Sequence, residues 1–386
     1  MNETYTYLSN FQKTLPPNRF AQGDLISWIG YCHAQAEKLK PDTTYTEKDY
    51  ALMSKLFERY AVKATQISQR YLETNDSLSS DLKTAEIYKV TDSSPTGADI
   101  LERTMFFSKK ADAIFTNAYE NTKEKPDHLI HVTCTGYISP SPAQKVVAQP
   151  SWQKSTGITH AYHMGCYASL PAIRIAQGLI AQNSPHHSNF TADIFHTEMC
   201  SLHMNTLNHT PEQIIVQTLF ADGHIKYTAQ SKPAQGVKSL KVLAIHEKII
   251  PESSQDMSWL PTPWGMQMNL SREVPQKIKE HLKDFLNEML KAAHLNPEEL
   301  RSAEFAIHPG GPKIIDTVKE ILELDESKMA YSKKILFERG NMSSATLPHV
   351  WEIMLADSKV IAGQKIISFA FGPGLTVFGS IMEVCS

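Results

Sequence analysis

The order of helix-forming and strand-forming segments is the feature that most restricts the fold of this chain. In the first half, the patterns predict helices over residues 50–71, 98–118, 165–181 and 214–219, and strands over residues 128–134 and 193–202. In the second half, they predict strands over residues 240–245, 304–308 and 365–371, and helices over residues 273–293, 311–324 and 343–356. Such alternation is typical of a layered α/β protein.

The two halves repeat a similar order of elements, and each would be incomplete by itself. We therefore expect a single α/β unit made of two pseudo-duplicated halves, residues 1–238 and residues 239–386. The length of 386 residues allows this, since one domain takes roughly 100–200 residues. A hydrophobic fraction of 41% and a charged fraction of 20% are ordinary for a globular protein.

The charge balance and the hydropathy pattern exclude several classes of protein. A net charge of −3 provides no general attraction for nucleic acid or for an anionic membrane. No apolar run reaches about 18 residues, and the N-terminus lacks a basic segment followed by an apolar one. We expect a cytoplasmic protein that neither binds nucleic acid nor enters a membrane as an integral protein.

The cysteines and histidines favour free thiols over a structural metal or a disulfide framework. There are five cysteines, an odd number, and none forms a CxxC pair. The 16 histidines include no HExxH motif, so we expect no metal site. In a reducing compartment one of the thiols can serve as a nucleophile.

Four segments combine residues that are suited to catalysis. They are HMGCYAS at residues 163–169, FAIHPGGP at 305–312, ERGNMSSA at 338–345 and AFGPGLTV at 370–377. Cys166 follows a glycine and opens the helix predicted over residues 165–181, where the helix dipole and a nearby histidine would lower the pKa of its thiol. The simpler interpretation is that Cys166 is a small buried apolar residue.

The other three segments are ambiguous when each is considered alone. His308 ends an apolar strand before a Pro-Gly-Gly-Pro turn, and such a histidine is more often structural than catalytic. Asn341 precedes a Ser-Ser helix start, which favours a capping role. The Gly372 and Pro373 pair marks only a sharp turn.

Taken together and in this order, the four segments resemble the active-site signatures of the chalcone and stilbene synthase family, the type III polyketide synthases. The resemblance runs from about residue 49 to the C-terminus. It implies a thiolase-like, five-layered αβαβα fold and a homodimer. It also implies that Cys166 holds an acyl group, that His308 pairs with its thiolate, and that His308 and Asn341 stabilise the enolate formed when a malonyl unit loses CO2.

The resemblance assigns roles to further positions. Arg59, Lys63 and Lys313 correspond to positions that contact coenzyme A or a carrier protein, although solvated surface cations explain the first two as well. Phe220 and Met268 correspond to the two residues between the entrance tunnel and the cavity. The remaining cavity positions are Cys134, Thr135, Cys200, His203, Gly372 and Pro373. For His203 we favour a hydrogen-bonded, space-filling role over an acid/base role.

The leading hypothesis is an acyltransferase that condenses an acyl starter with malonyl units, with or without later cyclisation to a pyrone or an aromatic ring. Its substrates are thioesters of coenzyme A or of an acyl carrier protein, and it needs no other cofactor. One alternative is a ketosynthase III-like enzyme that forms one bond or joins two carrier-bound β-ketoacyl chains. Another is a catalytically silent partner in a heterodimer, which the intact Cys166, His308 and Asn341 disfavour.

Overall fold

Helices and strands alternate along the whole chain in the computed structural model, which describes residues 5–40, 44–79, 81–183, 185–187 and 189–386. The first half contains β1 (Thr6–Thr14), β2 (Asn18–Ala21), α1 (Gln22–Lys38), α2 (Glu47–Tyr60), β3 (Gln69–Leu72), α3 (Ile100–Tyr119), β4 (His128–Thr133), α4 (Pro142–Val147), β5 (Gly157–Tyr162), α5 (Ser169–Asn183), β6 (Thr191–Met199), α6 (Pro211–Leu219) and β7 (Asp222–Gln230). The second half contains β8 (Ser239–Ile249), β9 (Met257–Thr262), β10 (Gly265–Leu270), α7 (Val274–Ala292), β11 (Glu304–Ile307), α8 (Pro312–Ile321), α9 (Ala330–Arg339), α10 (Thr346–Ala356), β12 (Lys365–Gly372) and β13 (Thr376–Cys385).

Hydrogen bonding joins the two halves into one sheet. Nine strands of the described residues lie in the order β11-β12-β13-β8-β1-β7-β6-β4-β5. The N-terminal strand β1 pairs antiparallel with β7 of the first half and with β8 of the second. The division that we predict, after residue 238, falls in the connection between β7 and β8. It stays a prediction, because β1 pairs with strands of both halves.

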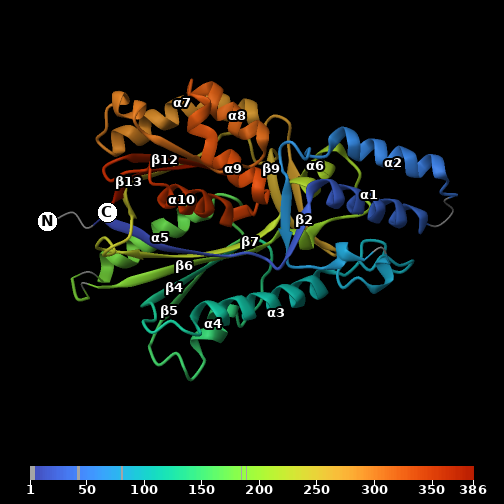
Figure 1. Cartoon of the computed structure of the whole chain (residues 1–386), viewed down its shortest axis with the longest axis horizontal. Helices are drawn as coiled ribbons and strands as arrows, with labels where there is room; N and C mark the ends of the chain where they lie inside the picture. The colour runs from blue at the N-terminus through green and yellow to red at the C-terminus, as the bar shows by residue number, and fades with distance from the viewer. Residues whose placement is uncertain (1–4, 41–43, 80, 184, 188) are drawn as a thin grey trace.

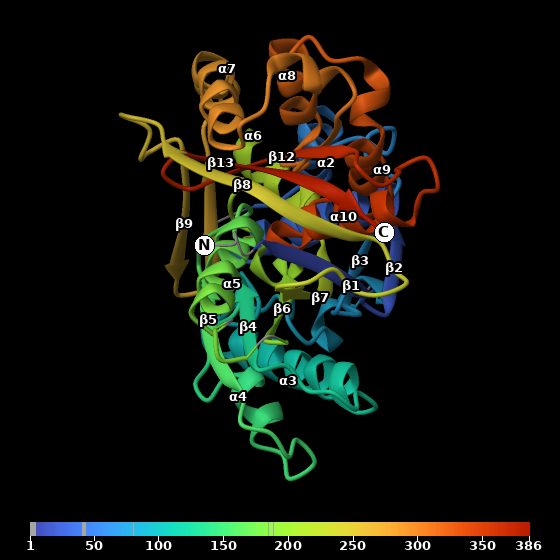
Figure 2. The ribbon, with the colours of Figure 1, turned by 90° about the vertical axis from the view of Figure 1, so that its left-hand side faces the viewer.

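The elements form five layers, which are seen edge-on in Figure 1. Helices α7 and α8 cover β12 and β13, while α3 covers the opposite face of the molecule, beside β4 and β5. Helices α5 and α10 lie in the middle layer, between the two parts of the twisted sheet, as Figure 2 shows from the side. The predicted layered, thiolase-like αβαβα fold is confirmed.

The middle layer is an apolar core that supports the turn before α5 and the turn before α10. Ile173 of α5 and Trp351 of α10 are both fully buried in one apolar cluster. The indole N–H of Trp351 is also satisfied, since it donates to the hydroxyl of Ser368 on β12 at 2.9 Å. The turn that precedes α5 carries Cys166, and the turn that precedes α10 carries Asn341. Both side chains are therefore positioned by closely packed helices.

Two predicted helix boundaries are wrong. The helix expected over residues 50–71 ends at Tyr60, because Ala61 takes up extended backbone and residues 69–72 pair with β2 as strand β3. The helix expected from residue 165 begins only at Ser169. Cys166 therefore lies in a turn before the helix and does not open it. Among the described residues, no helix combines the length and the apolar character needed to cross a bilayer.

Candidate active site

The turn that carries Cys166 is packed against the loop of residues 372–374. Gly165 has a φ of +84°, and a Cβ at this position would lie 2.6 Å from Cδ of Pro373. A Cβ on Gly372 would lie 1.9 Å from Cδ1 of Tyr167. Both contacts favour glycine, because the ring of the facing residue occupies the space that a Cβ would need. The Cys166 turn therefore has little freedom to move.

Asn341 uses the two ends of its side-chain amide differently. Its Oδ1 accepts hydrogen bonds from the backbone N–H of Ser343 at 2.9 Å and from the hydroxyl of Thr346 at 3.2 Å. Its amide nitrogen is thereby left to donate toward Cys166, and this hydrogen bond favours the thiolate. The capping role expected from local sequence and the role implied by the resemblance are both compatible with this arrangement.

The side chain of His308 is buried without a partner. Its backbone N–H donates to the carbonyl of Phe369 at 2.8 Å, which holds the end of β11 against β12. The ring is 1% exposed, and neither Nδ1 nor Nε2 has a hydrogen-bond partner among the described residues. A histidine with a structural role would have its ring nitrogens satisfied. This imidazole is instead free to bind a ligand, and it does not bond to Cys166 in the free protein.

Burial keeps both groups of the expected pair uncharged. It raises the pKa of the Cys166 thiol to about 12, although hydrogen bonds from Ser343 and Asn341 act in the opposite direction. It lowers the pKa of His308 to about 3. The expectation that the position of Cys166 lowers the pKa of its thiol is therefore wrong for the free protein, because desolvation outweighs the local hydrogen bonds. The resting state is a thiol and a neutral imidazole.

A buried carboxyl group organises the other side of the cysteine. Oε2 of Glu198 accepts hydrogen bonds from the backbone N–H of Cys134 at 3.0 Å and from the hydroxyl of Thr135 at 2.9 Å, while Oε1 accepts one from the hydroxyl of Ser344. Burial raises the pKa of Glu198, and its charge adds to the rise in the pKa of Cys166. Glu198 thus holds Cys134, Thr135 and Ser344 in place through hydrogen bonds. The Cys166 thiol itself stays protonated.

Cys166 borders a small space, which we call the reaction cavity. It has a volume of about 20 Å³, enough for about one water molecule. Its wall consists of Cys134, Thr135, Gly165, Cys166, Cys200, Phe220, Met257, Ser258, Trp259, Met268, Ser343 and Pro373. This list contains most of the predicted cavity positions, and Gly372 lies directly beside it. Phe220 and Met268 face the same space, as the resemblance implies.

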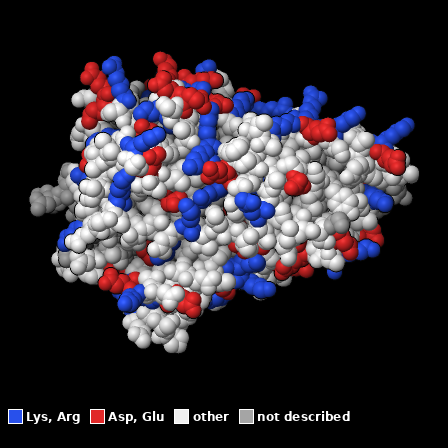
Figure 3. Space-filling model, viewed as in Figure 1, with Lys and Arg blue, Asp and Glu red and all other residues white. Residues whose placement is uncertain are grey.

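A larger depression, the outer pocket, reaches the surface between α2, α6 and α8. Its volume is about 480 Å³, and Arg59, Arg272 and Lys313 lie among the residues that line it. Arg272 pairs with Glu212 at 2.8 Å on the rim. Figure 3 shows basic side chains along the edge of the molecule where α2 lies. A cationic rim around an apolar interior suits a phosphorylated carrier with an acyl group.

The backbone at the end of α6 connects the outer pocket to the reaction cavity. Leu219 lines the outer pocket, whereas the next residue, Phe220, lines the reaction cavity. The segment is held by Asn341, whose N–H donates to the Leu219 carbonyl at 3.0 Å and whose carbonyl accepts from the N–H of Ala221 at 2.8 Å. Gly310, which contacts the ring of His308, also lines the outer pocket.

Comparisons with known proteins agree with this arrangement. Residues 241–385 match the family model described as chalcone and stilbene synthases, C-terminal domain. Type III polyketide synthase C of Arabidopsis thaliana is 25% identical over 287 residues, which are 70% of this chain and 74% of that protein. Type III polyketide synthase B of the same plant is 28% identical over 265 residues, 65% of this chain and 67% of that protein. The chain is therefore similar to the chalcone and stilbene synthase family, whose model matches its residues 241–385.

The fold of the chain matches that of a solved structure. The crystal structure of PKS-I from the brown alga Ectocarpus siliculosus has 21% sequence identity and a TM-score of 0.82, covering 99% of both chains. The resemblance inferred from the four sequence segments is therefore confirmed by the family model and by the curated relatives, and the solved structure confirms the fold.

The remaining predicted site residues lie in different surroundings. Arg59 and Lys313 line the outer pocket, but Lys63 does not, and its ammonium group donates to the carbonyl of Glu58. Nε2 of His203 bonds to the Thr135 carbonyl at 2.9 Å, and Nδ1 accepts the Met266 N–H at 3.1 Å. Both ring nitrogens of His203 are satisfied, which favours the space-filling role.

Sequence reasoning missed Glu198, Trp259 and Arg272. A glutamate within the apolar strand β6 is unusual, and this signal could have pointed to Glu198. No comparable signal marks Trp259 or Arg272, because each acquires its position from the β9–β10 hairpin or from the turn that follows it. Among the described residues, no three His, Cys, Asp or Glu side chains are grouped so that they could hold a metal ion.

Proposed function

We propose that the chain is a type III polyketide synthase, an acyltransferase that loads an acyl starter on Cys166 and extends it with a malonyl thioester. The observation that carries the proposal is that the Cys166 thiol borders a small apolar cavity and accepts a hydrogen bond from the Asn341 side chain. The unpartnered ring of His308 supports the same function, because it is a buried acid/base group with no structural task.

In the loading step, the Cys166 sulfur attacks the carbonyl carbon of the acyl thioester. The neutral imidazole of His308 takes the thiol proton, and the resulting thiolate and imidazolium stabilise each other in surroundings that disfavour either charge alone. The new S–C bond forms as the bond to the carrier sulfur breaks. The carrier thiolate leaves with the proton that His308 returns.

In the condensation step, a malonyl thioester loses its carboxylate as CO2, and the electron pair passes to an enolate. An imidazole N–H of His308 and the amide N–H of Asn341 donate to the enolate oxygen. The enolate carbon attacks the thioester carbonyl on Cys166 and forms the C–C bond, and the Cys166 thiolate leaves and is reprotonated. Scarcity of water in the cavity favours decarboxylation and protects the enolate.

The carrier of the thioesters binds at the outer pocket. Arg59, Arg272 and Lys313 are placed to hold phosphate groups of coenzyme A, with the pantetheine arm directed past Leu219. The same cations suit the acidic surface of an acyl carrier protein. All activation of the reacting carbons comes from the thioesters, so the reaction needs no further cofactor.

The protein acts as a homodimer through the free edge of its sheet. Strand β5 ends the sheet and pairs only with β4 among the described strands. An unpaired edge is suited to antiparallel pairing with the same strand of a second copy around a two-fold axis. The compartment is the cytoplasm, a place that suits the five cysteines, all of which are free thiols.

A ketosynthase-like enzyme that forms a single C–C bond is the second candidate. The observation that favours it is the volume of the reaction cavity, since about 20 Å³ leaves no room for a chain extended several times. The number of malonyl units in the product distinguishes the two candidates, because iterative extension incorporates several units for each starter.

The experiment is intact-protein mass spectrometry after incubation with acyl-CoAs of increasing chain length, with and without malonyl-CoA. We expect one acyl adduct on the wild-type protein and its consumption when malonyl-CoA is added. Cys166→Ala should form no adduct, whereas Cys385→Ala, which changes a cysteine at the end of β13, should load normally.

Two results would contradict the proposal. An adduct that persists in Cys166→Ala would show that another group is acylated. The absence of an adduct from both acyl-CoAs and acylated carrier proteins would leave the chain without the proposed activity. Loading from carrier proteins alone would preserve the reaction and exclude coenzyme A as the carrier.

A further inference from the structure

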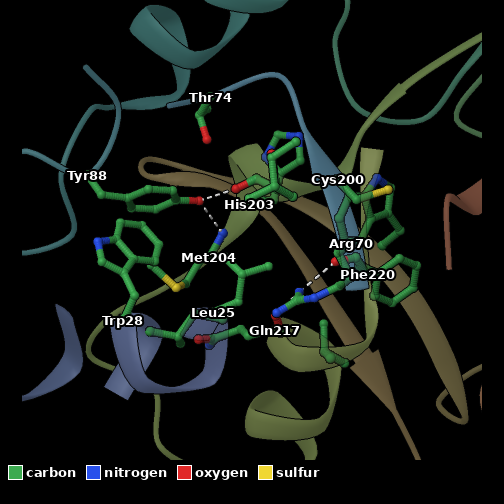
Figure 4. Close-up of a pocket in the computed structure, with 15 residues that line it drawn as sticks. Leu25, Trp28, Arg70, Thr74, Tyr88, Cys200, His203, Met204, Gln217 and Phe220 are labelled. Carbon is green, nitrogen blue, oxygen red and sulfur yellow. Dashed lines mark hydrogen bonds between the residues drawn. The ribbon is translucent and has the colours of Figure 1, made fainter. Parts of the chain in front are cut away.

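A second cavity, which we call the inner pocket, lies behind the reaction cavity. Its volume is about 40 Å³. Figure 4 shows Trp28 and Tyr88 on one side of it and Arg70 and Phe220 on the other. Cys200, Phe220 and Trp259 line both cavities and therefore form the wall between them.

Trp259 is held in this wall at both ends of its side chain. Its indole N–H donates to the carbonyl of Cys134 at 2.6 Å. Its ring packs edge-on against His203 with ring centres 5.6 Å apart, and His203 is itself fixed by two backbone groups.

Arg70 brings an unsatisfied positive group to the inner pocket. It is 2% exposed, and it donates from Nε to Oε1 of Gln22 at 2.8 Å and from Nη1 to the carbonyls of Gln217 and Phe220 at 2.9 and 2.8 Å. Its Nη2 has no hydrogen-bond partner among the described residues. Burial lowers the pKa of Arg70 to about 10, which leaves it charged at neutral pH.

Such a donor is unfavourable unless a ligand satisfies it. A buried N–H of a charged group loses its hydration and gains nothing in exchange when it has no acceptor. Thr74 also lines the inner pocket, and its hydroxyl points into the space in Figure 4. The pocket therefore offers hydrogen-bond donors at the end of a short, otherwise apolar space.

The reaction cavity cannot hold an acyl chain of ordinary size. With room for about one water molecule, it takes little more than an acetyl group on Cys166. A longer acyl group must extend into neighbouring free space, and the inner pocket is separated from the cavity only by the shared side chains.

We propose that the inner pocket binds the far end of the acyl group held on Cys166, and that Arg70 there selects chains carrying a keto or carboxylate oxygen. This inference rests on the proposed function and names its substrate class: short oxygenated acyl groups in preference to plain alkyl chains. Arg70 acts as a specificity-determining residue that contacts the substrate away from the reacting carbon.

The test compares acylation rates of Cys166 by acetyl-, butyryl- and acetoacetyl-CoA, measured by intact mass. Butyryl and acetoacetyl groups have the same chain length and differ by one keto oxygen. We expect the acetoacetyl group to load about tenfold faster than the butyryl group, because it satisfies a buried charged donor. Acetyl-CoA, which needs only the reaction cavity, reports on the chemistry itself.

Three variants separate binding in the inner pocket from other effects. Arg70→Lys removes the free Nη2, and Thr74→Leu fills the pocket without touching the bonds of Arg70. Both should lower the acetoacetyl-to-butyryl ratio to about one, and acetyl loading should stay near the wild-type rate in Thr74→Leu, which leaves the hydrogen bonds from Arg70 to the Gln217 and Phe220 carbonyls in place. Leu260→Ala, on the same strand as Trp259 but 52% exposed, is the control and should keep the wild-type ratio.

A wild-type ratio near one would overturn the inference and leave the proposed function intact. An acetoacetyl-to-butyryl ratio that stays at the wild-type value in Thr74→Leu would also overturn the inference, provided that this variant shows normal thermal unfolding. Thr74→Leu therefore keeps the inference testable if Arg70→Lys fails to fold. Failure of all three acyl-CoAs, including acetyl-CoA, to acylate Cys166 would overturn the proposed function and this inference together.

Discussion

At the residue scale, Asn341 shows how one side chain combines a structural and a chemical task. Its amide oxygen caps the turn through the N–H of Ser343, and this bond leaves the amide nitrogen directed toward Cys166. An aspartate could accept the same capping bond but would place a second negative charge beside the thiolate and the enolate. In the proposed mechanism, the amide is therefore required for the chemistry and not for the turn.

Alkylation by iodoacetamide, which reacts with thiolates, checks the protonation state of Cys166. Because burial raises the pKa of this thiol to about 12, the thiolate fraction should rise about tenfold for each pH unit between pH 7 and pH 10. We therefore expect slow alkylation at pH 7 and a steady rise in the alkylation rate, without a plateau, up to pH 10. Mass spectrometry of the peptide that contains Cys166 measures this rate.

The variant His308→Gln sharpens this measurement. Since the His308 ring makes no hydrogen bond in the free protein, its loss should change the alkylation profile little. Acylation by the best acyl-CoA should fall by at least about 100-fold, because the general base is gone. A plateau below pH 7 that His308→Gln abolishes would instead reveal a preformed thiolate–imidazolium pair.

The residues of the candidate site were more predictable than their charge states. Cys166, Asn341 and Pro373 stand out from sequence because they occur within ordered motifs. The sequence contains no comparable signal for the pKa of Cys166, since that depends on how completely distant segments exclude water from the thiol. The free Nη2 of Arg70 is equally hidden, because its neighbours come from α1 and α6.

At the element scale, two turns from opposite halves of the chain depend on each other. The turn before α5 and the loop between β12 and β13 each use a glycine where the other brings a ring, Gly165 against Pro373 and Gly372 against Tyr167. The position of the nucleophile is thus set by a contact between the halves and not by the helix that follows it.

Gly372→Ala should therefore damage the site more than a glycine substitution elsewhere. The added methyl group would lie 1.9 Å from Cδ1 of Tyr167, so the turn must shift, and we expect Cys166 acylation to fall at least about tenfold. The matched control is Gly178→Ala within α5, where nothing lies within 4 Å of the new Cβ.

The control should raise stability by about 0.5–1 kcal/mol, because alanine favours a helix over glycine. Thermal unfolding and the acylation rate of both variants are the measurements. Normal acylation by Gly372→Ala would show that the nucleophile turn tolerates displacement and that the contact between the halves does not position it.

Prediction at this scale succeeded where the periodicity of a segment matches its packing. The helices over residues 98–118 and 273–293 are found as α3 and α7 within two residues at each end. The strands β1, β7 and β13 were missed because none of them alternates clearly: β7 and β13 are buried on both faces, and β1 is buried at its first residues and exposed at its last ones. Strand β3 was taken for helix because only its pairing with β2 makes it extended.

At the scale of the whole molecule, histidines buried as neutral side chains couple folding to pH. Burial lowers the pKa to about 3 for His33, His196, His203 and His308. An unfolded chain binds a proton at each of these below its ordinary pKa of 6.5, whereas the folded chain does not. Their contribution to stability is complete above pH 6.5 and is lost as the pH falls toward 3.

We therefore expect the free energy of unfolding to decrease between pH 7 and pH 5. Each such imidazole lowers it by about 2 kcal/mol at pH 5. Asp222 acts in the opposite sense, since burial raises its pKa to about 6, but it is outnumbered. Urea unfolding at pH 7, 6 and 5 measures the change, and a free energy that stays constant or rises toward pH 5 would contradict it.

Dimer formation through β5 can be tested by removing one edge donor. The N–H groups of Gly157 and His163 point toward β4, so in alternation the N–H of His160 points to the open edge. His160→Pro removes that donor and should convert the dimer to a monomer at micromolar concentration in sedimentation velocity. His160→Ala keeps the donor and should remain dimeric; equal association of both variants would place the interface elsewhere.

Two consecutive residues, Leu219 and Phe220, line two different pockets, and this restricts which substitutions can alter one pocket alone. Leu219 borders the outer pocket and Phe220 borders the reaction cavity, so any displacement of this peptide alters both at once. Variation here would change carrier affinity and chain preference as linked traits. Independent evolution of chain preference must proceed through side chains such as Thr74 and Trp259, which are remote from the carrier.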